Sequence, residues 1–232
     1  MKCAVALVLL AGSPAYADWN VGVYLGIPYT LSSPLRLQLS PGTDVVFESV
    51  AYRGEPFTFP LYYGYRAGYF SNHLGIEAEL IHLKVFADPS EVVGRDGRIA
   101  GRTVMDAAPL GDVVQRFSIS HGLNLVLVNA VVRAPVRRRS SERRVSWVAR
   151  AGAGPTVPHG ESVIAGVGKE QYELGRIAIQ GAGGIELKIA GGAHLVGEYK
   201  LTTTRQRVGV AGGTASARFT THHVVFGAGY RF

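Results

Sequence analysis

The sequence predicts an all-β fold, an eight-stranded antiparallel up-and-down transmembrane β-barrel with long extracellular loops. Three observations support this prediction. Apolar residues alternate along the C-terminal segment, a short apolar export signal opens the chain, and the connections between strand-like segments alternate between long and short. A period of two indicates a strand with one apolar face, and alternating loop lengths are typical of barrels that cross a membrane. Taken alone, the C-terminal segment also fits an edge strand of a secreted sandwich, which is the alternative.

Residues 1–17 have the features of a cleaved secretory signal peptide. Lys2 precedes a short apolar run, and Ala15-Tyr16-Ala17 forms an A-x-A cleavage site. The apolar run is too short to span a bilayer. Cys3 is the only cysteine of the chain. We therefore expect the mature protein, residues 18–232, to contain no disulfide, catalytic thiol or thiolate metal site.

The composition fits one exported barrel domain over residues 18–232. The chain has 30 glycines, and its 11 tyrosines outnumber its 9 phenylalanines. Such strands place small residues in the lumen and aromatic residues at the membrane interfaces. The formal net charge of +7 suits a phosphate-bearing membrane surface. Basic proteins also bind nucleic acid, but export argues against that partner.

Eight strand-like segments follow one another as hairpins. Their predicted bounds, in order, are 19–31, 61–70, 74–87, 121–134, 145–157, 171–189, 193–204 and 217–232. The long connections are 32–60, 88–120, 158–170 and 205–216, and the short ones are 71–73, 137–144 and 190–192. In the first long connection, residues 43–52 form a further strand-like piece. An even number of strands places both termini on the periplasmic side, with the long loops outside.

Each predicted strand has a face that suits lipid. The outward residues include Trp19, Val21, Val23, Leu25 and Ile27, then Leu61, Tyr63, Tyr65 and Tyr69, then Ile76 and Leu80, then Trp147, then Ile177, Ile179, Ile185, Leu187 and Ile189, then Leu195, Tyr199 and Leu201, and finally Val224, Phe226, Tyr230 and Phe232. The last strand ends on an outward aromatic residue, which resembles the assembly signal of bacterial outer-membrane barrels. We expect a monomer that the outer-membrane assembly machinery inserts.

The opposite faces of the strands carry ions. The inward set comprises Arg66, Glu77, Glu79, Arg150, Arg176, Gln180, Glu186, Lys188, His194, Glu198, Lys200, Thr202 and Arg231. An unpaired buried ion costs several kcal/mol, and eight strands leave an interior that side chains can fill. We expect a salt-bridge network that plugs the lumen, rather than a pore. The alternative is that one of these groups is catalytic.

The third strand contains a break in its alternation. Counting on from Ile76 places His82 and Lys84 on the outer face. Either a bulge near Leu80-Ile81 turns both side chains inward, or they lie outside, above the hydrocarbon. In both cases they reach the level of the outer-leaflet headgroups, where a lysine can meet a phosphate and a histidine can transfer protons. The alternative is an interfacial anchor without chemistry.

Several short motifs, spread over most of the mature chain, occur in the same order as in one known family. They are Pro41-Gly42-Thr43-Asp44, Pro60-Leu61-Tyr62-Tyr63-Gly64, Leu74-Gly75-Ile76-Glu77-Ala78-Glu79, His82-Leu83-Lys84-Val85-Phe86-Ala87, His121-Gly122-Leu123-Asn124, Asn129-Ala130, Gly152-Ala153-Gly154, Val157-Pro158-His159 and Glu198-Tyr199-Lys200. In this order they resemble the lipid A oxidases of rhizobia, a family of outer-membrane barrels. The resemblance implies an oxygen-dependent enzyme that oxidises the proximal glucosamine of lipid A, in the lipopolysaccharide of the outer leaflet, to an aminogluconate.

The resemblance also suggests which polar residues form the site. On this hypothesis His82, Lys84, Glu198 and Lys200 are catalytic, and His121, Asn124 and His159 bind the substrate. Side chains alone do not activate oxygen, and no Gly-x-Gly-x-x-Gly fingerprint for a flavin or nicotinamide is present. A divalent metal ion is the remaining option, with His82, His121 and Asp88 as candidate ligands and His159 and Glu198 as further ones. The alternative function is that of a non-enzymatic structural or adhesive barrel whose outer loops bind partners.

Overall fold

A computed structural model of the chain describes residues 17–136 and 144–232. The predicted signal peptide, except for its last residue, and nearly all of the arginine-rich connection 137–144 lie outside the described residues. Within the described residues, no helix combines the length and the apolar character needed to cross a membrane.

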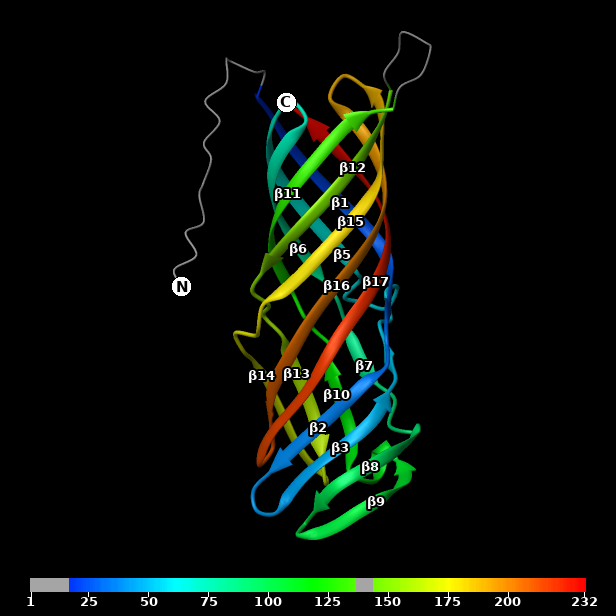
Figure 1. The fold of residues 1–232 in the computed structure, drawn as a ribbon, viewed down its shortest axis with the longest axis vertical. Coiled ribbons are helices and arrows are strands. Elements are labelled where there is room, and N and C mark those ends of the chain that lie inside the picture. The colour runs from blue at the N-terminus through cyan, green and yellow to red at the C-terminus, as the bar shows by residue number, and fades with distance from the viewer. Residues whose placement is uncertain (1–16, 137–143) are drawn as a thin grey trace, which may run out of the picture.

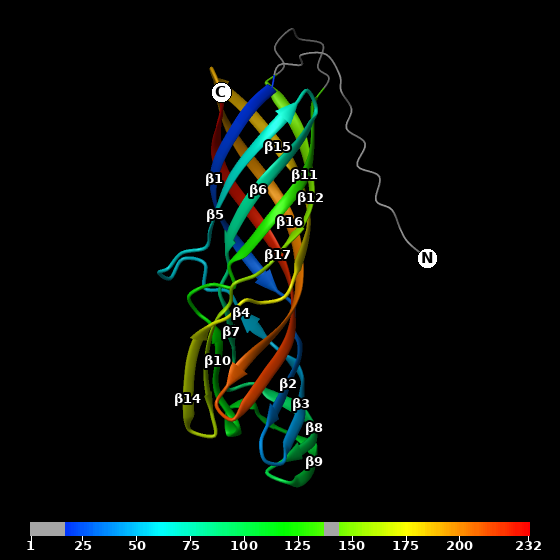
Figure 2. The ribbon, with the colours of Figure 1, turned by 90° about the vertical axis from the view of Figure 1, so that its left-hand side faces the viewer.

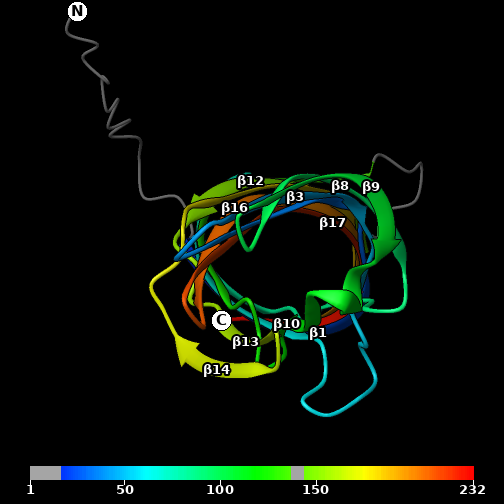
Figure 3. The ribbon, with the colours of Figure 1, turned by 90° about the horizontal axis from the view of Figure 1, so that it is seen from below.

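Eight long strands form the predicted barrel. They are β1 (Ala17–Thr30), β5 (Tyr63–Ser71), β6 (Leu74–His82), β11 (Leu125–Pro135), β12 (Val145–Gly154), β15 (Ala178–Ala190), β16 (Ala193–Val210) and β17 (Gly213–Arg231). Each pairs antiparallel with the next, and β17 pairs with β1, which closes the barrel (Figures 1 and 3). The predicted fold class is confirmed. Closure gives the backbone of every strand two partners, which hydrocarbon demands.

The barrel exterior is apolar, as the alternation predicts. Val23 pairs with Ala228 and Leu25 with Phe226 across the closing seam. Both Leu25 and Phe226 are exposed, at 55% and 66%. Such exposure would be costly in water, but these side chains face lipid in a membrane barrel. Both described ends of the chain lie at the same end of the barrel, as an even strand number requires (Figure 1).

The predicted long loops are largely strands, of which the sequence predicted only the piece at residues 43–52. They are β2 (Ser33–Leu39), β3 (Thr43–Val50), β4 (Tyr52–Arg53), β7 (Val85–Ala87), β8 (Val92–Ile99), β9 (Arg102–Pro109), β10 (Val114–Ile119), β13 (His159–Ile164) and β14 (Val167–Tyr172), with a short 3-10 helix, η1 (Leu110–Asp112). Strands β2, β3, β8 and β9 continue the barrel sheet from β17. Strands β14, β13, β10, β7 and β4 form a separate five-stranded sheet. Together with the adjoining ends of β16 and β17 they form what we call the extension, below the barrel in Figures 1 and 2.

The extension has the inverse polarity of the barrel. Its core consists of buried apolar side chains, among them Leu35, Phe47, Leu110, Ile119 and Phe219. Water surrounds a structure outside the membrane, so its apolar residues turn inward. Within the barrel the same chain directs apolar residues outward, because lipid is the solvent there.

Several predicted strand bounds are wrong. The predicted loop 205–216 is mostly strand, because the seventh strand runs on to Val210 and the eighth begins at Gly213, and both continue into the extension. The third strand ends at His82 instead of residue 87, because residues 85–87 form β7 in the other sheet. The fourth begins at Leu125, because the chain before it crosses from β10. The sixth begins at Ala178, because residues 171–172 belong to β14 and residues 173–177 belong to no strand. Alternation identifies a strand but not the sheet that it joins.

Candidate functional site

The barrel lumen contains the predicted network of ions. Arg66 lies 2.8 Å from Glu79 and 2.5 Å from Glu198, and Arg150 lies 2.9 Å from Glu77. Lys200 is fully buried and pairs with Glu79 and, at 3.2 Å, with Glu198. Each buried ion therefore has partners of opposite charge, as desolvation requires.

Little space remains in this part of the lumen. The cavity beside Tyr24, Arg66 and Arg150 has a volume of about 10 Å³, which is enough for one water molecule. The predicted catalytic residues Glu198 and Lys200 thus lie within the plug. Arg176 and Lys188 were also expected in the lumen, but both are exposed. Arg176 lies outside because it precedes β15, beyond the reach of the barrel alternation.

His82 is buried at the end of β6, by neither of the two routes considered. The pairing of β6 with β5 and β11 is regular, without a bulge, so His82 keeps its outward phase. Its ring stacks on Tyr63 at 4.8 Å, and its Nδ1 lies 2.9 Å from Oδ1 of Asn124. The segment at Gly122 covers it: a Cβ at Gly122 would lie 2.4 Å from His82 Nδ1, and the φ of +101° there suits glycine. The Nε2 of His82 has no hydrogen-bond partner.

In the part of the chain that the structure describes, no hydrogen bond or ion pair joins Lys84 or Asp88 to another candidate residue. Lys84 is buried between β6 and β7, and its ammonium donates to the carbonyl of Thr58 at 2.7 Å. Burial lowers the pKa of this ammonium. The Asp88 carboxylate accepts hydrogen bonds from the hydroxyl and amide of Ser90, which lower its pKa. Asp88 therefore caps a turn, and the structure does not bring it to a histidine.

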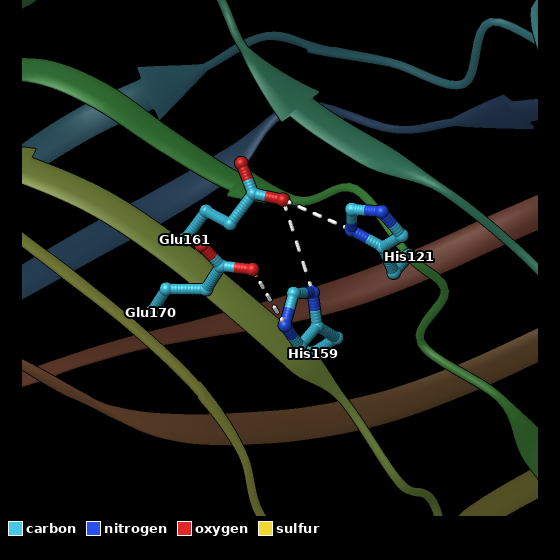
Figure 4. Close-up of side chains that lie close together, drawn as sticks. All are labelled: His121, His159, Glu161 and Glu170. Atoms are coloured by element: carbon cyan, nitrogen blue, oxygen red, sulfur yellow. Dashed lines mark hydrogen bonds and ion pairs between the residues drawn. The ribbon is translucent and has the colours of Figure 1, made fainter.

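Two predicted residues, His121 and His159, meet two glutamates that the sequence did not single out (Figure 4). The Nδ1 of His121 lies 3.1 Å from Oε1 of Glu161, and the Nε2 of His159 lies 3.0 Å from Oε1 of Glu170. One ligand atom from each residue lies within 4.8 Å of all the others. Among the described residues, this is the group of histidines and carboxylates that could hold a metal ion. We call it the His/Glu cluster.

The local fold explains how the cluster forms. His159 and Glu161 lie on one face of β13, because they are two residues apart. Glu170 lies directly opposite Glu161 in the β13–β14 hairpin, and His121 follows β10, which pairs with β13. Two like charges directly opposite each other destabilise a sheet. A cation between Glu161 and Glu170 would remove that repulsion.

Neighbouring groups orient the cluster but leave one buried nitrogen without a hydrogen bond. Arg116 lies 2.7 Å from Oε2 of Glu161, and the hydroxyl of Ser120 donates to Oε1. His159 is 5% exposed, and its Nδ1 makes no hydrogen bond but lies 3.8 Å from Oε1 of Glu161 (Figure 4). Buried polar atoms without a partner are rare and often indicate an ion or water. The side chains of His121 and Glu170 are exposed at 55% and 62%, so the cluster opens to one side.

The donor set suits a transition metal. Imidazole favours zinc, copper, iron or nickel, whereas carboxylates add affinity for harder ions. The remaining predicted residue, Asn124, links the cluster region to His82. Its Oδ1 accepts a hydrogen bond from His82 Nδ1, and its amide nitrogen donates to the carbonyl of Val157 at 3.2 Å. Asn124 thus positions backbone around the cluster.

Comparison with protein families supports the architecture. The model of the family described as outer membrane protein beta-barrel domain matches residues 3–232. Among solved structures, Ail of Yersinia pestis, in complex with the heparin analogue sucrose octasulfate, is 12% identical, with 93% of this chain and 99% of that chain covered and a TM-score of 0.39. Neisserial surface protein A is 10% identical (93% and 97% covered, TM-score 0.41). AlkL in lipid bilayers is 13% identical (100% and 97% covered, TM-score 0.42). No curated protein sequence matches significantly.

Proposed function

The chain belongs to the outer membrane protein β-barrel domain family and is an outer-membrane barrel of the small eight-stranded type. For this barrel we propose an enzymatic function, the oxidation of lipid A at its proximal glucosamine. The resemblance of its motifs to the lipid A oxidases motivates this proposal. The observation that supports it best is the His/Glu cluster. It joins two residues of those motifs, His121 and His159, to two carboxylates outside the barrel lumen.

The location of the cluster suits a lipid headgroup as substrate. The cluster residues belong to β13, β14 and the segment after β10, which lie in the extension, and Figure 1 shows this extension at the end of the barrel opposite the described ends of the chain. In a barrel with periplasmic termini that end faces the cell exterior, where the sugars of lipid A lie. Two of the four side chains are exposed, so a sugar hydroxyl can approach.

The chemistry balances with oxygen as the oxidant. The lactol carbon loses its hydrogen and the lactol hydroxyl its proton, and two electrons and two protons reduce O₂ to hydrogen peroxide. Water then opens the lactone to the aminogluconate. A metal ion held by His121, His159, Glu161 and Glu170 would supply the redox chemistry that side chains lack. Glu170, being exposed, is the group of the set best placed to accept the hydroxyl proton.

The experiment is a mass spectrum of lipid A from an expression host whose lipid A has a free anomeric hydroxyl. With oxygen, we expect a species with one additional oxygen atom, which is absent without oxygen. His159→Gln and Glu161→Gln should abolish it, while heat-modifiable gel migration, the sign of a folded barrel, is retained. His73→Gln, in the β5–β6 turn, is the matched control. If inserted wild-type protein gives no oxidised species, the proposal is wrong and a structural or adhesive role replaces it.

A further inference from the structure

A second feature of the extension lies in the region where it meets the barrel. A groove of about 800 Å³ is lined by five arginines: Arg36, Arg176, Arg205, Arg207 and Arg218. They come from β2, the segment before β15, β16 and β17. All five are exposed, and the groove shares no residue with the His/Glu cluster.

The arginines of the groove are short of counter-charge. Arg36 pairs with Asp44 at 2.7 Å through two parallel hydrogen bonds. In the part of the chain that the structure describes, Arg176, Arg205, Arg207 and Arg218 have no carboxylate within 4.0 Å. Arg207 donates only to the hydroxyl of Thr214.

Two of these arginines are placed in a way that costs free energy. Arg205 and Arg218 are direct cross-strand partners in the β16–β17 pair. Like charges at such positions repel each other and destabilise the sheet. On a surface that only contacts water, like charges are usually spaced apart. An anion bound between Arg205 and Arg218 would attract both guanidinium groups and so offset their mutual repulsion. Guanidinium groups bind phosphate oxygens in pairs with fixed geometry.

The position of the groove relative to the membrane hydrocarbon indicates which kind of molecule carries the anion. The outward residues of β16 run from Tyr199 and Leu201, which face lipid, through Thr203 to Arg205. Four residues span about 13 Å of strand, or about 10 Å along the membrane normal at the tilt usual in barrels. Arg205 therefore lies just above the hydrocarbon, at the depth of a sugar headgroup. On β17, Phe226 and Val224 face lipid. Arg218 lies beyond them toward the extension, at the same depth as its cross-strand partner Arg205.

We propose that this groove binds the phosphate groups of a glycolipid headgroup in the outer leaflet. The binding does not depend on oxidation at the His/Glu cluster. It fixes the rotation of the barrel relative to its lipid neighbours and holds a phosphorylated sugar against β16 and β17. Phosphate binding by exposed guanidinium groups is electrostatic, so the affinity falls as salt rises.

The test is native mass spectrometry of the detergent-solubilised barrel with added monophosphoryl lipid A. The double variant Arg205→Gln, Arg218→Gln should lose at least tenfold in affinity. The matched control, Arg98→Gln with Arg102→Gln on the β8–β9 hairpin, removes the same charge outside the groove and should stay within twofold of wild type. Equal binding by the two double variants would overturn the proposal.

Two further arms identify the ligand. The same lipid without phosphate should bind wild type and the groove variant equally, and at least tenfold more weakly than the phosphorylated lipid binds wild type. If inorganic phosphate binds wild type as tightly as the phosphorylated lipid does, the assignment to a membrane glycolipid is overturned. The same holds if a sulfated oligosaccharide binds wild type and the phosphorylated lipid does not. His159→Gln should bind monophosphoryl lipid A as wild type does, so failure of the oxidation proposal and failure of this one are separable.

Discussion

At the scale of single residues, the same residue types have different roles on the two sides of the membrane interface. In the lumen, Glu79 has two cations as partners and Glu198 has three, and these charges compensate one another. In the extension, Glu161 and Glu170 lie opposite each other beside two histidines. Compensated charges stabilise a fold, whereas convergent like charges are typical of a binding site.

Sequence reasoning found part of each group. Strand alternation identified Arg66, Glu79, Glu198 and Lys200 as inward, because the barrel strands are long and regular. Glu161 and Glu170 were missed, since they lie in a segment that was read as a loop. The signal was present in His159-x-Glu161, which has the spacing of one strand face, but the hairpin partner that supplies Glu170 follows a turn without the usual Asn-Gly signature.

Lys200→Met tests the lumen network. The substitution leaves Glu79 with one cation fewer in a buried site, so we expect a loss of about 3–5 kcal/mol in the free energy of unfolding. The urea midpoint of the barrel in lipid vesicles measures it. Lys188→Met, at an exposed position, should change the midpoint little. If Lys200→Met unfolds as wild type does but no longer oxidises lipid A, Lys200 is catalytic instead, as the resemblance suggested.

Metal analysis tests the His/Glu cluster apart from any activity. Protein extracted from membranes and dialysed should retain about one divalent transition-metal ion per chain, since four ligand atoms converge. His159→Gln should lower the content at least tenfold, and His73→Gln should not. Chelation of the wild-type protein should then produce the same loss. An equal metal content in wild type and His159→Gln would show that the ion binds elsewhere.

At the scale of elements, barrel strands were predictable and the strands of the extension were not. The barrel strands are long, and lipid selects one face along their whole length. β2, β3 and β10 are short, and they combine buried and exposed residues according to which sheet covers them. Residues 43–52 are predicted to be strand-like, and β3, at Thr43–Val50, confirms this. Which strands β3 pairs with depends on contacts between segments that are distant in the sequence, and the alternation of residues within one segment does not reveal such contacts.

Phe47→Ala tests whether the extension has a core of its own. Phe47 is fully buried, and truncation of a buried phenylalanine costs about 3–5 kcal/mol. We expect proteases to cleave the extension of this variant in intact membranes, while the barrel strands stay protected. Phe57→Ala, at a side chain that is 75% exposed, should leave the cleavage pattern unchanged. Equal protease resistance of Phe47→Ala and wild type would show that Phe47 does not stabilise the extension.

At the scale of the whole molecule, the chain consists of two β-structures with opposite polarity that share β16 and β17. These two strands have 18 and 19 residues, longer than a membrane crossing needs. They run from the lipid-facing band into the extension, so the barrel forms one continuous sheet with β2, β3, β8 and β9, whereas the other five strands of the extension form a separate sheet. Both proposed sites belong to the extension or to its junction with the barrel. The functional account therefore depends on the extension facing the outer leaflet.

Cysteine labelling in intact cells tests that orientation most directly. Cys3 is the only cysteine in the sequence and lies in the predicted signal peptide, so single-cysteine variants need no further background change. Met105→Cys, at the exposed tip strand β9 of the extension, should react with a membrane-impermeant maleimide on intact cells. Asn72→Cys, in the β5–β6 turn, should react only after the outer membrane is permeabilised. Labelling of Asn72→Cys but not Met105→Cys on intact cells would contradict the account.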